Sequence, residues 1–415
     1  MGLMKHQNAL PSFGLKTFMT LAAIGLVAVA LFFFYTRSTQ TEAPARPNPS
    51  EIYAADGGDR LYSPFSLQID PMERLLLINF EQDPDEIYVG FEPQVFDDPV
   101  HGRGMLVIGW RVDGRVDVYH QPGLILDPAT YDIAGQGLAE MVERPFTDAY
   151  FEVNAAGVDA YFAFDDLLGR RIEVTVQERN ARPRKPFGLL APMGSAAASP
   201  SALPLVFLHD FYFVRQGDTN LSIVVDGQVR RPDALPIPLD GMRMHFTRYS
   251  PDPLIATLNP AYEGPLAPLE RTGEQEARLG DLVFDLVDNQ GRTEIVQMRR
   301  TFKQREIAVA FNPPLPHLLN LADGAETSGT FTLRGDPSVG TVTGEYRIKR
   351  AGSSVEVQLT PGGGWRPNES KWELRFLYWV ASVFKQWPKT YLWTGSLDLT
   401  DPEQVTMQST WRRTE

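Results

Sequence analysis

Two adjacent side chains capable of acid–base chemistry, His209 and Asp210, lie in the middle of the apolar run LPLVFLHDFYFV at 203–214. This density of β-branched, aromatic and aliphatic residues predicts a β-strand. Successive residues of a regular strand face opposite sides, so we expect only one of the two side chains to point inward. An imidazole or carboxylate in that position could orient a ligand or transfer a proton. The alternative is a buried polar residue with a purely structural partner.

Aromatic side chains around these two residues could bind an apolar ligand. They occupy the same predicted strand and the strand-like segment VDAYFAF. Few polar contacts within an apolar lining are typical of small-molecule sites. The expected ligand-binding residues are Phe207, Phe211, Tyr212, Phe213 and Tyr161.

A third candidate catalytic residue, Asp165, precedes Asp166 between two predicted strands. Adjacent carboxylates can share a proton, which raises the pKa of one of them. The alternative is a turn that begins with aspartate, closes at Gly169 and pairs a carboxylate with a following arginine.

Basic and apolar side chains occur together in the segment RPRKPFGLLAPMG at 182–194, which is predicted to be a long loop between strands. Loops of this length are often functional. In an acidic protein tethered to a membrane, such a loop would suit anionic head groups and insert its apolar side chains. The alternative is a loop whose leucines fold back under the barrel. The expected membrane-contact residues are Arg182, Arg184, Lys185, Phe187, Leu189 and Leu190.

Several other kinds of chemistry have no support in the sequence. The chain has no cysteine, which excludes thiol catalysis, disulfides and cysteine–zinc sites. It contains neither the glycine-rich loops of nucleotide-binding proteins nor a His-Glu-x-x-His zinc helix nor a Gly-x-Ser-x-Gly elbow. The formal net charge of −13 argues against broad nucleic-acid binding, which requires a basic face. We therefore expect no cofactor, no metal and no nucleic-acid partner.

The N-terminal region contains an uncharged run, FMTLAAIGLVAVALFFFY at 18–35. It is long enough to cross a bilayer as a helix, and its aromatic end suits the membrane interface. The alternative is a cleaved signal peptide. We expect a single-pass anchor at 18–36, a short cytoplasmic N-terminus at 1–17 and a flexible linker at 37–60. This arrangement predicts a cell-membrane protein whose body lies on the extracytoplasmic side.

From residue 61 onward, short apolar runs alternate with turns rich in glycine and aspartate, as in LLLINF at 75–80. This spacing predicts antiparallel sandwiches or barrels rather than a parallel α/β sheet. We expect a first β unit at 61–240, a proline-rich connection at 241–278 and a second β unit at 279–415.

One amphipathic helix is predicted at 369–387, because Trp372, Phe376 and Trp379 recur every three or four positions and Pro388 follows. The predicted fold class is thus all-β and mainly antiparallel, with two barrel- or sandwich-like units, an N-terminal transmembrane helix and this late helix. The architecture resembles that of the lipocalins, and the resemblance concerns architecture alone. Gly363-Gly364-Trp365 has the letters of the lipocalin Gly-x-Trp motif, but lipocalins carry the motif near the start of the barrel.

Three function classes fit this prediction. The first is a membrane-anchored protein that binds an apolar or lipid-like ligand. The second is an enzyme that acts on an isoprenoid or another membrane-derived substrate by Asp/His acid–base chemistry. The third is an envelope scaffold that binds protein or glycan. A closed apolar cavity would favour the first, converging acid–base residues the second, and solid cores with an exposed aromatic patch the third.

Overall fold

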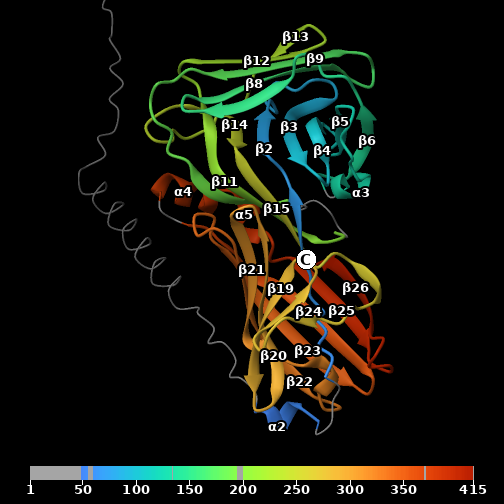
Figure 1. Ribbon diagram of the computed structural model, residues 1–415. Coiled ribbons are helices and arrows are strands. Elements are labelled where there is room, and N and C mark those ends of the chain that lie inside the picture. The colour runs from blue at the N-terminus through green and yellow to red at the C-terminus, as the bar shows by residue number, and fades with distance from the viewer. Residues whose placement is uncertain (1–47, 55–58, 133, 194–199, 369–370, 415) are drawn as a thin grey trace, which may run out of the picture. The chain divides into compact units, whose positions relative to one another are not determined.

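Antiparallel β-strands make up most of the regular structure in the computed structural model (Figure 1). The structure describes residues 48–54, 59–132, 134–193, 200–368 and 371–414. None of the helices within these ranges has the length and apolar composition of a membrane span. The anchor expected at 18–36 and the N-terminus at 1–17 lie outside the described residues.

Ten strands make the main sheet of the first β unit: β1 (Leu67–Pro71), β2 (Arg74–Asn79), β3 (Tyr88–Asp98), β4 (Gly102–Arg111), β5 (Val116–His120), β6 (Leu138–Glu143), β10 (Phe187–Ala191), β11 (Leu203–Arg215), β14 (Met244–Ser250) and β15 (Asp252–Leu258). Their order is β1-β15-β11-β14-β2-β3-β4-β5-β6, with β10 paired to β11. β5 and β6 are parallel, and the other pairs of this sheet are antiparallel. A short helix, α3 (Pro128–Tyr131), precedes β6.

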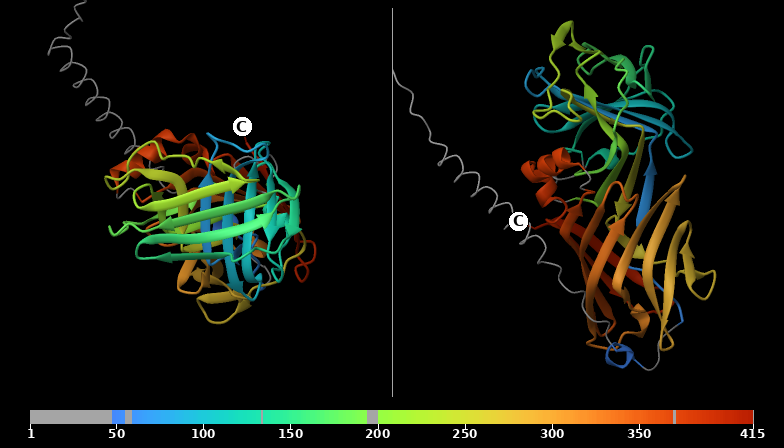
Figure 2. Two further views of the ribbon diagram at one scale, coloured as in Figure 1. Left: turned by 90° about the horizontal axis from the view of Figure 1, so that it is seen from above. Right: turned by 90° about the vertical axis from the view of Figure 1, so that its left-hand side faces the viewer.

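A smaller sheet covers one side of this unit, and its strands run across those of the main sheet (Figure 2). Its order is β13 (Gln228–Arg230), β12 (Thr219–Val225), β9 (Arg171–Glu178), β8 (Gly157–Asp165) and β7 (Tyr150–Asn154). Alternate residues of β9, including Ile172 and Val174, are buried, as the period-2 pattern predicts. The two sheets meet through aromatic rings, with the centroids of Tyr119 and Phe164 4.6 Å apart.

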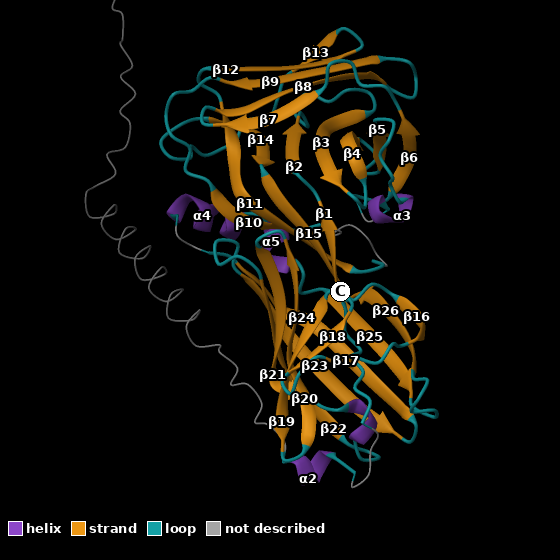
Figure 3. Ribbon diagram, in the orientation of Figure 1, coloured by secondary structure: helices purple, strands orange, loops and turns teal. Residues whose placement is uncertain are grey.

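The second β unit is one antiparallel sheet that curls into a half-barrel (Figure 3). Its eleven strands are β16 (Tyr262–Pro265), β17 (Glu270–Arg271), β18 (Glu276–Leu279), β19 (Leu282–Asn289), β20 (Arg292–Phe302), β21 (Arg305–Leu315), β22 (Glu326–Arg334), β23 (Thr341–Ala351), β24 (Ser354–Arg366), β25 (Tyr391–Asp398) and β26 (Thr406–Arg413). The order is β16-β26-β25-β24-β23-β22-β21-β20-β19-β18-β17, and a 3-10 turn at Leu318–Asn320 links β21 to β22. The prediction of a mainly antiparallel all-β protein is confirmed.

Residues 49–54 and 59–66 pack into the second unit before the chain enters the first one. It begins with the short helix α2 (Pro49–Ile52). Tyr53 is buried, and the Phe65 ring stacks on Phe311 of β21 with a centroid distance of 5.4 Å. The described part of the linker predicted at 37–60 is therefore anchored to the second unit, because its few apolar side chains find buried positions there.

The region 241–278 is not a simple connection. It contains β14 and β15, which belong to the first unit, and β16 to β18, which belong to the second. Pro251, Pro260 and Pro268 lie between these strands, Pro253 is the second residue of β15, and Pro265 is the last residue of β16. The density of proline therefore marks closely spaced strand ends, where a missing N–H is tolerated.

Two short helices replace the single helix predicted at 369–387: α4 (Trp372–Val380) and α5 (Ser382–Gln386). The backbone of Ala381 between them is extended, with φ −75° and ψ 108°. The break turns the chain so that Tyr378 of α4 and Phe384 of α5 both pack on Trp365, with ring centroids 5.0 and 5.5 Å away.

Candidate functional site

A pocket of about 590 Å³ lies between the main sheet of the first unit and the helices α4 and α5. This volume is within the usual range of small-molecule sites. Leu377, Tyr378 and Phe384 contribute to it from the helices. The sheet contributes a mainly apolar lining that includes Leu75, Leu77, Leu208, Phe211, Phe213 and Ile255.

The strand order brings one polar cluster to this apolar lining. Phe213 of β11 is opposite Arg248 of β14, and Arg248 is in turn opposite Leu77 of β2. Leu75, two residues before Leu77, is opposite Gln94 of β3. Directly paired residues and residues two apart share a face of a sheet, so these side chains converge on the pocket.

Glu92 is the most deeply buried acid of the pocket, with 2% of its surface exposed. Its carboxylate accepts hydrogen bonds from Gln94 Nε2 at 2.8 Å and from Trp110 Nε1 at 3.0 Å. Burial raises the pKa of Glu92 to about 7, while these hydrogen bonds and the charge of Arg248 act in the opposite direction. The carboxyl group can therefore exchange a proton near neutral pH.

Arg248 brings a positive charge to the same end of the pocket. One terminal nitrogen donates to Asn79 Oδ1 at 2.6 Å and to the carbonyl oxygen of Phe246 at 3.0 Å. Burial lowers the pKa of Arg248 to about 10, so it remains charged at neutral pH. Among the residues that the structure describes, no carboxylate forms an ion pair with this guanidinium, although Glu81 and Glu92 act on it from a longer distance.

Three buried polar atoms of residues that line the pocket lack a hydrogen-bond partner among the described residues. They are Nε of Arg111, whose guanidinium pairs with Asp117, the side-chain oxygen of Gln94 and the hydroxyl of Tyr378. Buried polar atoms in proteins nearly always have a partner, so an unpaired acceptor and an unpaired hydroxyl suggest contacts that a ligand would complete.

His209 and Asp210 do not line the pocket. His209 is buried at 3% exposure, and its Nδ1 lies 2.9 Å from the carbonyl oxygen of Asp252. Burial lowers the pKa of His209, which keeps the imidazole neutral. Asp210 is exposed and has a left-handed backbone with φ of 47°. His209 is thus a buried polar residue with a structural partner, which is the alternative given for it in the sequence analysis.

The backbone at Asp210 changes which residues of β11 face the pocket. Leu208 and Phe211 both line it, although they are an odd number of positions apart. A regular strand would put them on opposite faces, and the left-handed residue between them reverses the alternation. Beyond this point, β11 also changes its partner from β15 to β14.

Only two of the five aromatic residues expected to bind a ligand line the pocket. These are Phe211 and Phe213. Phe207 packs close to Gly335 of the second unit, and the Tyr212 hydroxyl donates to Asp240 at 2.7 Å. Tyr161 lies on the smaller sheet.

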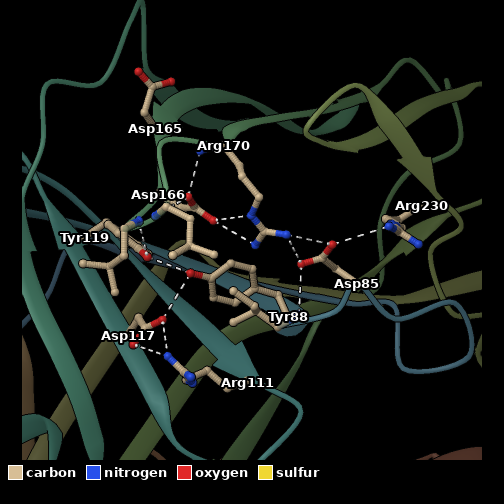
Figure 4. A network of polar contacts seen from close by, with 12 residues as sticks. Asp85, Tyr88, Arg111, Asp117, Tyr119, Asp165, Asp166, Arg170 and Arg230 are labelled. Carbon is tan, nitrogen blue, oxygen red and sulfur yellow. Dashed lines mark hydrogen bonds and ion pairs between the residues drawn. The ribbon is translucent and has the colours of Figure 1, made fainter.

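Asp165 is exposed at the end of β8, whereas its neighbour Asp166 is buried (Figure 4). Asp166 accepts from the backbone N–H groups of Leu168 and Arg170, and the Arg170 guanidinium bridges Asp166 and Asp85. This geometry corresponds to the alternative of a turn with a paired arginine.

The rest of that network joins strands β3, β4 and β5. The hydroxyls of Tyr88 and Tyr119 are 2.6 Å apart, and Tyr88 also donates to Asp117 at 3.1 Å (Figure 4). Arg111 pairs with Asp117 at 3.1 Å. Each carboxylate in this cluster has an arginine or tyrosine partner, so we assign the cluster a structural role.

The segment expected to touch a membrane is partly a strand. Phe187–Ala191 forms β10, where Leu190 is 1% exposed and both Phe187 and Leu189 line the pocket. This geometry corresponds to the alternative in which the leucines of the segment fold back into the protein. Arg182 and Lys185 are exposed before the strand, and the Arg184 guanidinium lies over the Tyr249 ring at 5.7 Å.

The polar residues of the pocket were not among the candidates drawn from the sequence. Glu92 and Gln94 alternate with apolar residues in GFEPQVF, which is also the pattern of a strand with one face in solvent. Trp110 follows the apolar run MLVIG of β4, and Arg248 lies in the region expected to be a connection. Only the pairing of β14 with β2 shows that Arg248 lies on the same face of the sheet as Glu92, Gln94 and Trp110.

Among the described residues, no group of three or more histidine, aspartate or glutamate side chains could hold a metal ion. The pocket combines a mainly apolar lining with a few charged and amide side chains. Comparison with known proteins finds no matching family model, no matching curated protein and no matching solved structure.

Proposed function

We propose that this protein binds an apolar or lipid-like ligand in the pocket of the first β unit. The observation that carries the proposal is a mainly apolar lining interrupted by a polar cluster, Glu92, Gln94, Trp110 and Arg248, which we call the polar end. Such a lining favours an apolar ligand, and a few placed polar groups would fix its orientation. The interior of the second unit is filled by side chains such as Phe65, Phe311 and Trp393.

Helix α4 supports a connection to a lipid surface. Its outward residues Trp372, Phe376 and Trp379 are 67%, 46% and 55% exposed, while Leu377 and Tyr378 of the same helix line the pocket. Residues 366–389 contain five lysines and arginines against two glutamates, in a chain of net charge −13. An aromatic face with a local basic excess suits an anionic bilayer, which we propose as its partner. The anchor expected at 18–36 would keep the body near such a surface.

A second candidate function, acid–base catalysis on a membrane-derived substrate, is favoured by Glu92. A carboxyl group whose pKa is about 7 inside an apolar pocket is suited to give and take a proton at neutral pH. In this case Glu92, rather than His209, Asp210 or Asp165, would be the acid–base residue.

Native mass spectrometry of the detergent-purified full chain tests the proposed function. We expect one apolar molecule per chain to persist after extensive detergent exchange. Leu77→Trp should remove it, because the larger ring would fill the pocket beside Arg248. Val229→Trp is the matched control, since Val229 is 73% exposed on β13. A bound molecule that is retained equally in both variants would place the binding elsewhere.

A further inference from the structure

The polar end of the pocket has a positive charge without a direct counter-ion. The hydrogen bonds of Arg248 to side-chain and backbone oxygens go to neutral groups of Asn79 and Phe246. No carboxylate in the described part of the chain pairs with its guanidinium. An unpaired charge beside apolar surface is costly, and buried charges in proteins therefore usually meet an opposite charge. A ligand with an anionic group would supply that charge.

Gln94 and Glu92 provide a second, independent indication of a ligand head group. Gln94 is 5% exposed, and its side-chain nitrogen holds Glu92 while its side-chain oxygen has no partner. Glu92 can present a proton in its neutral form. The polar end therefore combines guanidinium donors with a carboxyl group that can donate to a ligand oxygen. The free oxygen of Gln94 only accepts, so its partner would be a donor that accompanies the ligand, such as a water molecule.

We propose that the ligand is a long-chain carboxylate whose head group binds the guanidinium of Arg248 and whose alkyl chain lies against Leu77, Leu208 and Phe213. This inference rests on the proposed function, binding of an apolar ligand in this pocket, and adds the chemistry of the head group. A guanidinium presents parallel N–H donors that match the two oxygens of a carboxylate. The lining then accommodates the chain without further polar contacts.

The charge of the neighbours favours a monoanion. Arg111 also lines the pocket, but its guanidinium is paired with Asp117 and Asp113. Arg248 is therefore the guanidinium available to the head group, and Glu81 and Glu92 line the same pocket. A phosphate monoester carries about −1.5 to −2 charges at neutral pH and would be repelled more strongly by these acids than a carboxylate. A neutral alcohol would leave the guanidinium without a counter-charge.

Photoaffinity labelling of the full chain in amphipol tests this inference. The probes are a diazirine analogue of palmitic acid and the matching fatty alcohol, with cross-linked peptides mapped by mass spectrometry. We expect the acid probe to label peptides of β2, β3, β11 or β14, and palmitate to compete at about tenfold lower concentration than hexadecanol or hexadecyl phosphate. Arg248→Met should reduce labelling by the acid probe at least about tenfold and leave labelling by the alcohol probe within about twofold.

Two further variants separate charge from folding. Arg248→Lys keeps the charge without the paired donors and should retain part of the labelling. Arg243→Met removes an exposed charge just before β14 and should label like wild type. Equal labelling by both probes with no effect of Arg248→Met would overturn the carboxylate inference while leaving pocket binding intact. Better competition by hexadecyl phosphate would overturn it in favour of a phosphate, and no labelling of the pocket by either probe would refute the proposed function itself.

Discussion

At the scale of single residues, the environment of Glu92 determines what the pocket can do. Its carboxyl group is buried beside Trp110 and Gln94, and the nearest positive charge, Arg248, is not in direct contact. Burial therefore outweighs the stabilising partners, and the pKa of Glu92 rises to about 7. A modest change in pH would alter the charge that a bound head group meets.

We predict that binding of a long-chain carboxylate weakens as pH rises above 7. A free carboxyl group is ionised above about pH 5, so between about 5 and 7 an anionic ligand meets a neutral Glu92. Above pH 7, Glu92 becomes negative and repels it. Competition for the acid probe should weaken about tenfold between pH 6 and 8.5, which corresponds to a further rise of the Glu92 pKa by about one unit.

Glu92→Gln should abolish this pH dependence. Other titratable groups around the pocket are Arg248 of β14, Arg111 of β4, Tyr131 of α3, Tyr378 of α4 and Glu81 after β2. Arg248 has a pKa of about 10, and the pKa values of Arg111, Tyr131 and Tyr378 are raised, so none of these four changes charge between pH 6 and 8.5. Glu81 is present in both the wild type and the Glu92→Gln variant, so it cannot cause a difference between their pH profiles. An unchanged pH profile in the Gln variant would show that another group is responsible.

The sequence could predict that β11 carries polar residues in an apolar strand, but not which of its residues face a site. His209 was the candidate because it interrupts an apolar run, and the structure pairs it with the backbone of Asp252 instead. Arg248 and Glu92 are far apart in sequence and meet only because β14 and β3 both pair with β2. Local patterns contain no information on such long-range pairing.

At the scale of elements, two local features shape the pocket. The left-handed Asp210 reverses the alternation of β11 and turns Phe211 and Phe213 inward. The extended Ala381 separates α4 from α5 and lets both helices cover the pocket. The helical periodicity at 369–387 correctly predicted the spacing of the aromatic residues. It predicted one uninterrupted helix, however, because the break at Ala381 depends on packing against Trp365, which periodicity does not report.

The outer face of α4 should contact lipid in the reconstituted full chain. Because the chain has no cysteine, Phe376→Cys can be labelled at a single position with an environment-sensitive dye. In liposomes with anionic lipids, the dye should be quenched by nitroxide-labelled lipid, since amphipathic helices bury their apolar face at the head-group boundary. Val229→Cys, on the smaller sheet, is the control and should remain unquenched. Equal quenching at the two positions would argue against a specific contact through α4.

At the scale of the whole molecule, the two β units differ in what fills them. The first unit leaves a pocket of about 590 Å³ beneath α4 and α5. The second is closed by side chains, including those of residues 49–54 and 59–66. Strand content and antiparallel pairing followed from short apolar runs and turn residues. The assignment of residues 49–54 and 59–66 to the second unit could not be predicted, because the neighbours of Phe65 there come from the distant β21 and β25.

Phe65 should therefore stabilise the second unit although it precedes the first one in sequence. Its ring lies 5.4 Å from those of both Phe311 and Trp393 and is 2% exposed. Phe65→Ala would leave a cavity between these rings, and we expect a loss of about 3–5 kcal/mol in the free energy of unfolding. Urea unfolding of the full chain, followed by tryptophan fluorescence, measures the change. Arg60→Ala, which removes a partly exposed partner of Glu403, should cost no more than about 1 kcal/mol. If both variants unfold like wild type, the segment is a tether and not part of the core.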